Sequence, residues 1–191
     1  MQNSKRWATR ALAAGIASML VLPGQALERE GPFLRGRMPV AAPAGAVALC
    51  RDLAWACAAS SPADLTEKQI AHAKRVNSAV NRGVREVTDQ SQYGIAERWA
   101  LPTRRGGDCE DFALLKKREL VASGLPPQRL LLATALDRRR NPHVVLVLRT
   151  PQGDLILDNL TEEVVRWSQT GYTFLRMQDP AAPSGWTALV G

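Results

Sequence analysis

The sequence predicts an α+β fold in which helices from the first half of the chain pack on an antiparallel sheet from the second half. Two segments with helical signals lie between residues 66 and 123. Three short apolar runs rich in β-branched residues follow between residues 130 and 160, with turn residues between them. Helices that precede the strands, instead of alternating with them, are typical of this class.

The chain begins with the pattern of a secretory signal. Three basic residues precede a short apolar run, and small residues follow it at positions 23–26, where a signal peptidase would cut. The apolar run has about a dozen residues, whereas a membrane span needs about 20. The basic residues are Lys5, Arg6 and Arg10.

We therefore expect residues 1–26 to be a cleaved signal peptide and residues 27–191 to form a single domain without a membrane span. An uncleaved anchor has a similar pattern and is the alternative. Export would make the protein periplasmic or secreted.

The net charge gives little support for nucleic-acid binding. The formal charge is +7, and loss of the three basic residues with the signal would lower it to +4. The remaining arginines gather in short clusters at residues 104–105 and 138–140, without interleaved aromatic residues or a nucleic-acid motif. We interpret these clusters as solvated surface and expect no nucleic-acid partner.

The positions of the three cysteines predict one disulfide and one free thiol. Residues 27–48 are rich in Pro, Gly and Ala without a sustained period, so we expect an extended or poorly ordered lead-in. Cys50 and Cys57 follow it, and in an oxidising compartment they are predicted to form a disulfide, which leaves Cys109 as a free thiol. The alternative is that all three are buried as small apolar residues.

An amphipathic helix is predicted after Thr66. Residues 66–69 have the form of a capping box. Asn77 interrupts the apolar stripe, either as a hydrogen-bonded core amide or as a residue that supports a site. Residues 88–105 lack a period and are predicted to form a loop, in which Trp99 packs over a site or fills the core. The stripe consists of Ile70, Ala73, Asn77, Val80, Val84 and Val87.

The stretch Gly106-Gly107-Asp108-Cys109-Glu110-Asp111 is the candidate functional segment. The glycines allow a close backbone approach, Asp108 can cap a helix, and Cys109 falls in its first turn. The helix dipole there favours a reactive thiolate. The neighbouring acids oppose it, so such a nucleophile requires a protonated histidine or a bound cation.

Strands are predicted at residues 130–136, 143–149 and 154–160, after Gly124 ends the Cys109 helix. We expect them to form an antiparallel meander packed on the helices.

The turn between the second and third predicted strands decides whether His143 and Asp158 lie on the same face of the sheet. A two-residue loop, or a four-residue loop at 150–153, would pair Arg149 with Asp154 and make His143 and Asp158 diagonal neighbours on one face. A three-residue loop would turn Asp158 to the opposite face unless a bulge restored it. The turn sequence fits either form.

Three motifs in this order, GGDCEDFALLK, NPHVVLVL and LILDNL, resemble the bacterial transglutaminase-like cysteine proteinase family. Its best-known members are LapG-type periplasmic proteases that cleave large surface adhesins. The likeness covers residues 65–160 and includes segments 76–81 and 93–99. It implies a papain/transglutaminase-like fold with the catalytic cysteine at a helix N-terminus.

The resemblance also implies an activity and roles for three residues. The protein would be a thiol endopeptidase in which Cys109 is the nucleophile, His143 the general base and acid, and Asp158 the group that orients the imidazole. The partners would be a protein substrate such as a surface adhesin and an inner-membrane receptor for cyclic-di-GMP.

Calcium dependence is a further implication of the resemblance. The ligands carried over are Asp108, Glu110 and Asp111, whose carboxylates are the hard oxygen donors that Ca²⁺ prefers. Taken without the resemblance, the same acids can simply cap the helix and favour its dipole.

Three other interpretations use the same residues. A zinc site of Cys109, His143 and Asp158 lacks the usual ligand spacing. A non-catalytic peptide-binding module on the same fold, and a transamidase in which an amine replaces water, both remain alternatives.

Overall fold

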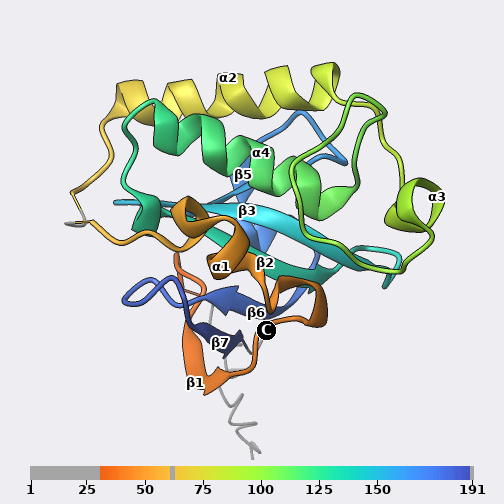
Figure 1. Ribbon diagram of the computed structural model, residues 1–191. Helices are drawn as coiled ribbons and strands as arrows, with labels where there is room; N and C mark the ends of the chain where they lie inside the picture. Colours follow the sequence, from red (N-terminus) through yellow and green to blue (C-terminus); the bar gives the residue numbers. More distant parts are fainter. Residues whose placement is uncertain (1–30, 61–62, 190–191) are drawn as a thin grey trace, which may run out of the picture.

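A seven-stranded antiparallel sheet carries helices on one face (Figure 1). The computed structural model describes residues 31–60 and 63–189, so the predicted signal peptide lies outside the described residues. The strand order is β1-β7-β6-β2-β3-β4-β5. The mixture of helices and antiparallel strands confirms the α+β prediction.

The strands are β1 (Gly36–Val40), β2 (Leu130–Leu136), β3 (Pro142–Thr150), β4 (Gly153–Leu157), β5 (Val165–Arg166), β6 (Thr173–Gln178) and β7 (Trp186–Leu189). The α-helices are α1 (Leu49–Asp52), α2 (Glu67–Gly83), α3 (Asp89–Tyr93) and α4 (Cys109–Ala122). Short 3-10 turns are η1 (Ala44–Ala46), η2 (Ala54–Cys57), η3 (Pro127–Arg129) and η4 (Trp167–Gln169).

Helix α4 packs against the sheet, and α2 lies alongside α4 on the side away from the sheet (Figure 1). The predicted capping box is present, because Thr66 and Gln69 exchange hydrogen bonds at the start of α2. The helix ends at Gly83, so the last two members of the predicted apolar stripe, Val84 and Val87, lie outside it. Within the described residues, none of the helices combines the length and apolarity that crossing a membrane requires.

The hairpin between β3 and β4 has the first of the two predicted registers. Arg149 pairs with Asp154 and Thr150 pairs with Gly153, which leaves a two-residue loop. Strand β4 stops at Leu157, so Asp158 follows directly after the strand and does not lie within it. This register is the one that brings Asp158 to the face of His143.

The two faces of β3 contribute to two apolar clusters. Val144, Leu146 and Leu148 pack under the helices, and Val145 and Val147 pack on the opposite face. Because successive strand residues point to opposite faces, both faces of the sheet are covered. This double burial explains why β2 and β3 are apolar without alternation.

One local prediction took the first of its two forms, and another was wrong. The lead-in before Cys50 is extended over β1, which pairs with β7 near the end of the chain. Its side chains are mostly exposed, so no alternating pattern marked it. The predicted loop after Thr88 contains α3, whose single turn is too short to show a period; the Thr88 hydroxyl accepts a hydrogen bond from Ser91 N (3.3 Å).

The cysteine prediction is confirmed. Cys50 and Cys57 form a disulfide, and Cys109 is free. A disulfide is typical of proteins that fold in an oxidising compartment. Trp99 fills the core, where it meets Trp186 edge to face at 5.8 Å between ring centroids.

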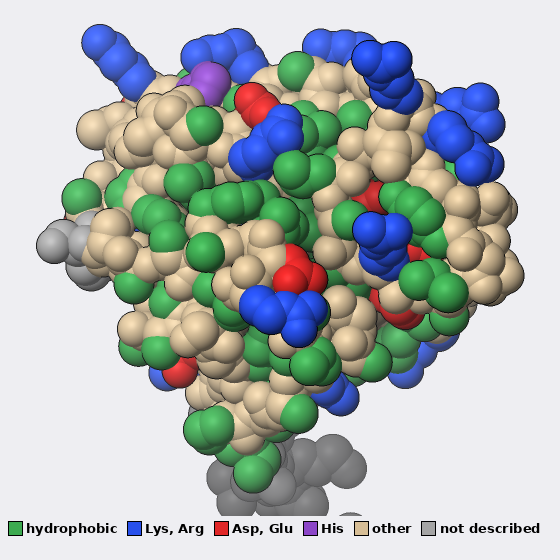
Figure 2. All heavy atoms as spheres, in the orientation of Figure 1, with side chains coloured by type: hydrophobic (Ala, Val, Ile, Leu, Met, Phe, Trp, Pro, Cys, Tyr) green, Lys and Arg blue, Asp and Glu red, His purple; other side chains and the backbone are tan. Residues whose placement is uncertain are grey.

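Charged side chains are dispersed on the visible surface. Figure 2 shows Lys and Arg side chains around the upper rim of the molecule and acidic side chains in small patches among them. This mixed distribution fits the interpretation of the arginine clusters as solvated surface.

Candidate active site

Cys109 is the first residue of α4, after the two glycines that the sequence singled out. Gly106 has a φ of +128°, and a Cβ there would lie 2.0 Å from the Arg85 carbonyl oxygen. A Cβ on Gly107 would lie 2.4 Å from Asp111 Oδ2. Only glycine fits both positions without displacement of the backbone or of the Asp111 side chain.

The Cys109 thiol is partly buried and has an acidic neighbour. Its Sγ donates to Glu110 Oε2 at 3.3 Å. Burial raises the pKa of the Cys109 thiol well above its usual range, and Glu110 adds to this effect, whereas a hydrogen bond from the Val144 backbone opposes it. Without a bound cation, these effects favour the neutral thiol over the thiolate.

His143 and Asp158 form a buried pair. His143 Nε2 lies 2.8 Å from Asp158 Oδ1, and the two residues are 6% and 3% exposed. Burial by itself raises the pKa of Asp158, but bonds from His143 and Tyr172 outweigh it and leave the pKa below its ordinary value. The carboxylate is therefore ionised at neutral pH.

The sulfur lies at the end of the sheet that carries this pair. The backbone hydrogen bond from Val144 reaches Cys109, and Val144 directly follows His143 in β3. Nε2 of His143 is engaged by Asp158, so Nδ1 is the ring nitrogen that does not make this contact.

Two residues to which the sequence analysis assigned no role hold Asp158. The Tyr172 hydroxyl donates to Asp158 Oδ2 at 2.6 Å. Asn81 Nδ2, from α2, donates to the Asp158 carbonyl oxygen at 2.8 Å. Neither lies at a spacing that connects it to Asp158, so no local signal could have indicated these contacts.

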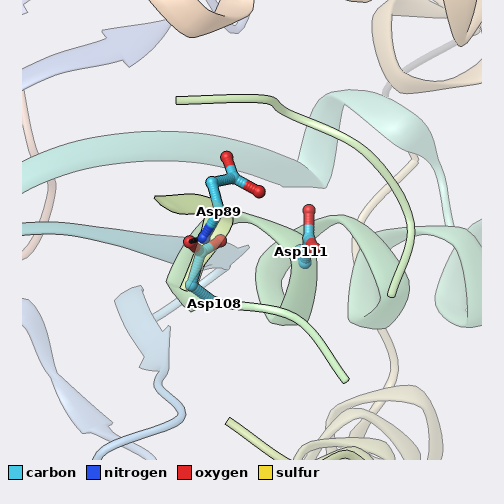
Figure 3. Close-up of side chains that lie close together, drawn as sticks. All are labelled: Asp89, Asp108 and Asp111. Carbon is cyan, nitrogen blue, oxygen red and sulfur yellow. Dashed lines mark hydrogen bonds between the residues drawn. The ribbon is translucent and has the colours of Figure 1, made fainter. Parts of the chain in front are cut away.

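Three aspartates form an acidic cluster at the start of α4 (Figure 3). Asp108 and Asp111 come from α4 and its cap, and Asp89 comes from the start of α3. One ligand oxygen from each lies within 4.8 Å of the others. Asp89 N donates to Asp108 Oδ2 at 2.9 Å, so Asp108 ties the two helices together and its side chain does not cap α4.

Each aspartate of this cluster keeps one buried oxygen without a partner among the described residues. These atoms are Asp89 Oδ1, Asp108 Oδ1 and Asp111 Oδ2. The other oxygens of Asp89 and Asp111 accept hydrogen bonds from the backbone of Arg98 and Ala100. Buried acceptors that lack a donor are costly, so the cluster is suited to a cation with oxygen ligands.

The charges in the cluster disfavour one another. Burial raises the pKa of Asp111 to about 7, with added contributions from Asp108 and Asp89. Burial, followed by the Asp108 charge, also raises the pKa of Asp89. These carboxyls would therefore release protons on binding a cation.

Glu110 lies outside the aspartate cluster and contacts the sulfur. Burial, followed by the charge of Asp108, raises the pKa of Glu110 to about 9. The structure thus brings Asp108 and Asp111 together with Asp89, which sequence reasoning placed in a loop. Asp89 is 19 residues before Asp108, and no metal-binding spacing connects them.

Comparison with known proteins identifies the family. The sequence profile of the family described as bacterial transglutaminase-like cysteine proteinase, BTLCP, matches residues 37–191. Among curated proteins, none matches the sequence significantly.

Solved structures of LapG from Legionella pneumophila are similar to this chain. The calcium-bound form gives a TM-score of 0.51 at 28% identity, over 61% of this chain and 67% of that one. The EGTA-treated form gives 0.50 at 28%, over 58% and 63%. The matches therefore span about two thirds of the LapG chains. The chain belongs to the bacterial transglutaminase-like cysteine proteinase family and is a cysteine peptidase.

Proposed function

We propose that this cysteine peptidase is an exported thiol endopeptidase that hydrolyses a peptide bond in a protein substrate through Cys109, His143 and Asp158. The observation that carries the proposal is the buried 2.8 Å contact between His143 and Asp158 at the strand end that also binds Cys109. A histidine oriented by a carboxylate beside a thiol is the arrangement that nucleophilic catalysis requires.

The first half of the reaction begins with a neutral thiol. Because the pKa of Cys109 is raised, its proton leaves to Nδ1 of His143 as the sulfur attacks the substrate carbonyl. Asp158 stabilises the imidazolium that forms. The backbone N–H of Cys109, at the start of α4, would donate to the oxyanion.

The tetrahedral intermediate then collapses to a thioester, and the imidazolium gives its proton to the departing amine. In the second half, His143 takes a proton from water, which hydrolyses the thioester and restores the thiol. If an amine replaced water at this stage, the same residues would perform transamidation. Release of a free acid or incorporation of a labelled amine distinguishes the two outcomes.

We also propose that the cluster of Asp89, Asp108 and Asp111 holds Ca²⁺, with Glu110 beside it. The unpartnered buried oxygens support this assignment. One of the similar solved structures is a calcium-bound LapG, which gives it further support. Bound Ca²⁺ would supply positive charge that offsets the carboxylates next to the thiol. The chain's own contribution is to hold these oxygens rigidly at the start of α4.

Localisation and substrate form the last part of the proposal. The disulfide and the family likeness support a periplasmic or secreted protein, with residues 1–26 as its signal peptide and residues 27–191 as one peptidase domain. By the same likeness, the substrate would be an envelope or surface protein such as an adhesin, and an inner-membrane receptor would regulate the enzyme.

The test compares cells that produce the wild-type protein with cells that produce Cys109→Ala. We expect at least one envelope protein to be shortened only in wild-type cells. In vitro, iodoacetamide should modify Cys109 and remove activity, and EGTA should lower it. Cys50→Ser with Cys57→Ser is the matched control, because it alters cysteines away from the site. Identical envelope proteins in both strains, with an alkylation rate unaffected by His143→Ala, would refute the proposal.

A further inference from the structure

Tyr172 contacts both members of the His143–Asp158 pair. It lies between η4 and β6, in the part of the chain for which the sequence offered no functional signal. Its hydroxyl donates to Asp158 Oδ2 at 2.6 Å. Its ring stands edge to face against the His143 imidazole, with centroids 5.7 Å apart and an interplanar angle of 87°.

We propose that Tyr172 is a positioning residue that fixes the Asp158 carboxylate and, through it, the tautomer and orientation of the His143 imidazole. This inference rests on the proposed function, since it assigns a role within the same triad. Tyr172 itself does not touch the substrate or the reacting sulfur in this assignment.

The two oxygens of Asp158 have different partners. Oδ1 contacts His143 Nε2 at 2.8 Å and accepts from Leu160 N at 3.0 Å, whereas Oδ2 accepts from Tyr172. A carboxylate held at both oxygens cannot rotate about its Cβ–Cγ bond without breaking a hydrogen bond. The bond from Tyr172 is charge-assisted and therefore among the stronger ones in the site.

The backbone around Tyr172 is also fixed. Tyr172 N donates to Thr170 Oγ1 at 3.1 Å, and Arg138 Nε donates to the Thr170 carbonyl oxygen at 2.6 Å. Gly171, with a φ of +72°, makes the turn between them. The phenol is thus presented to Asp158 by a turn that is tied to the β2–β3 connection, directly before the strand that carries His143.

The test uses Tyr172→Phe, which keeps the ring and removes only the hydroxyl. The sequence contains two tyrosines, so Tyr93→Phe is the matched control; the ring of Tyr93 lies under the Arg98 guanidinium, a contact that Phe preserves. The sequence also contains two histidines, so a His72→Gln background leaves His143 as the single imidazole for NMR. Thermal unfolding is measured in parallel to show that each variant is folded.

In Tyr172→Phe, we expect alkylation of Cys109 by iodoacetamide to slow about tenfold, the effect of losing one hydrogen bond to a charged group. The imidazole N–H proton that faces Asp158 should exchange with water faster and move upfield. Tyr93→Phe should change neither quantity. A residue with only a structural role would alter the unfolding temperature without moving the imidazole signal.

The variant Asp158→Asn separates the two ways of failing. If it slows alkylation while Tyr172→Phe keeps both the rate and the imidazole signal of the wild type, the positioning role of Tyr172 is refuted and the triad stands. If Asp158→Asn reacts as fast as the wild type, the triad is refuted and the role of Tyr172 falls with it.

Discussion

Replacement of Asp111 by Asn should stabilise the protein when Ca²⁺ is absent. When Ca²⁺ is added, the same replacement should destabilise the protein relative to the wild type. Asp111 Oδ1 accepts a hydrogen bond from Ala100 N at 3.1 Å, which an amide oxygen can also accept. Its Oδ2 has no donor among the described residues and belongs to the cluster with Asp89 and Asp108. An amide NH₂ at that position would donate to their carboxylates. Asn has the same shape, so it also fits against Gly107.

The magnitude follows from the pKa of Asp111, which burial raises from 3.8 to about 7. At about 1.4 kcal/mol per pH unit this difference is about 4 kcal/mol, and screening by solvent reduces it to about 2 kcal/mol. Because the folded protein binds this proton more tightly than the unfolded chain, wild-type stability without metal falls as pH rises from about 4 to about 7. Asp111→Asn should remove that loss.

Thermal unfolding followed by circular dichroism measures both effects. In EGTA at pH 8, Asp111→Asn should melt about 4–8 °C above the wild type. In Ca²⁺ at about 100 times the dissociation constant, the wild type should gain about 2.7 kcal/mol and the variant much less. The control is Glu119→Gln, an exposed acid on the same helix. Equal stabilisation of wild type and Asp111→Asn by Ca²⁺, with no gain in EGTA, would show that the cluster does not bind the ion.

Three further changes are measured by the same unfolding experiment. Gly106→Ala should destabilise the protein by about 2 kcal/mol or more, because the new Cβ meets the Arg85 carbonyl oxygen at a positive φ. Cys50→Ser should cost about 2.5 kcal/mol by opening the short loop to Cys57. Burial lowers the pKa of Lys117 to about 7, so the stability of the wild type should rise from pH 7 towards 10.5. Lys117→Met should remove this rise of stability with pH.

Each of these predictions has a control in the same chain. Gly83→Ala places a Cβ in open space and should be neutral or slightly stabilising. A reducing agent should lower the melting temperature of the wild type but not of Cys50→Ser. Lys68→Met, on the exposed face of α2, should leave the pH profile unchanged. A Gly106→Ala protein as stable as Gly83→Ala, or equal pH profiles for the two lysine variants, would contradict the reasoning.

Local sequence determined the elements whose partners lie close in the chain. The capping box at Thr66, the glycines before Cys109 and the apolar strands β2 and β3 all depend on neighbouring residues or on burial of both faces. The hairpin was limited to two registers, and the structure selects the one with a two-residue loop. The disulfide prediction followed from the count of cysteines together with the predicted export signal.

The tertiary structure alone decided the remainder. Strand β1 joins β7, Asp89 joins Asp108 and Asp111, and Tyr172 reaches Asp158. No period, cap or turn signal in the sequence indicates which segments make these contacts, because local geometry does not fix how the segments lie relative to one another. The sequence contains the acidic residues, but only the packing of α3, α4 and the sheet brings their carboxylates close to one another.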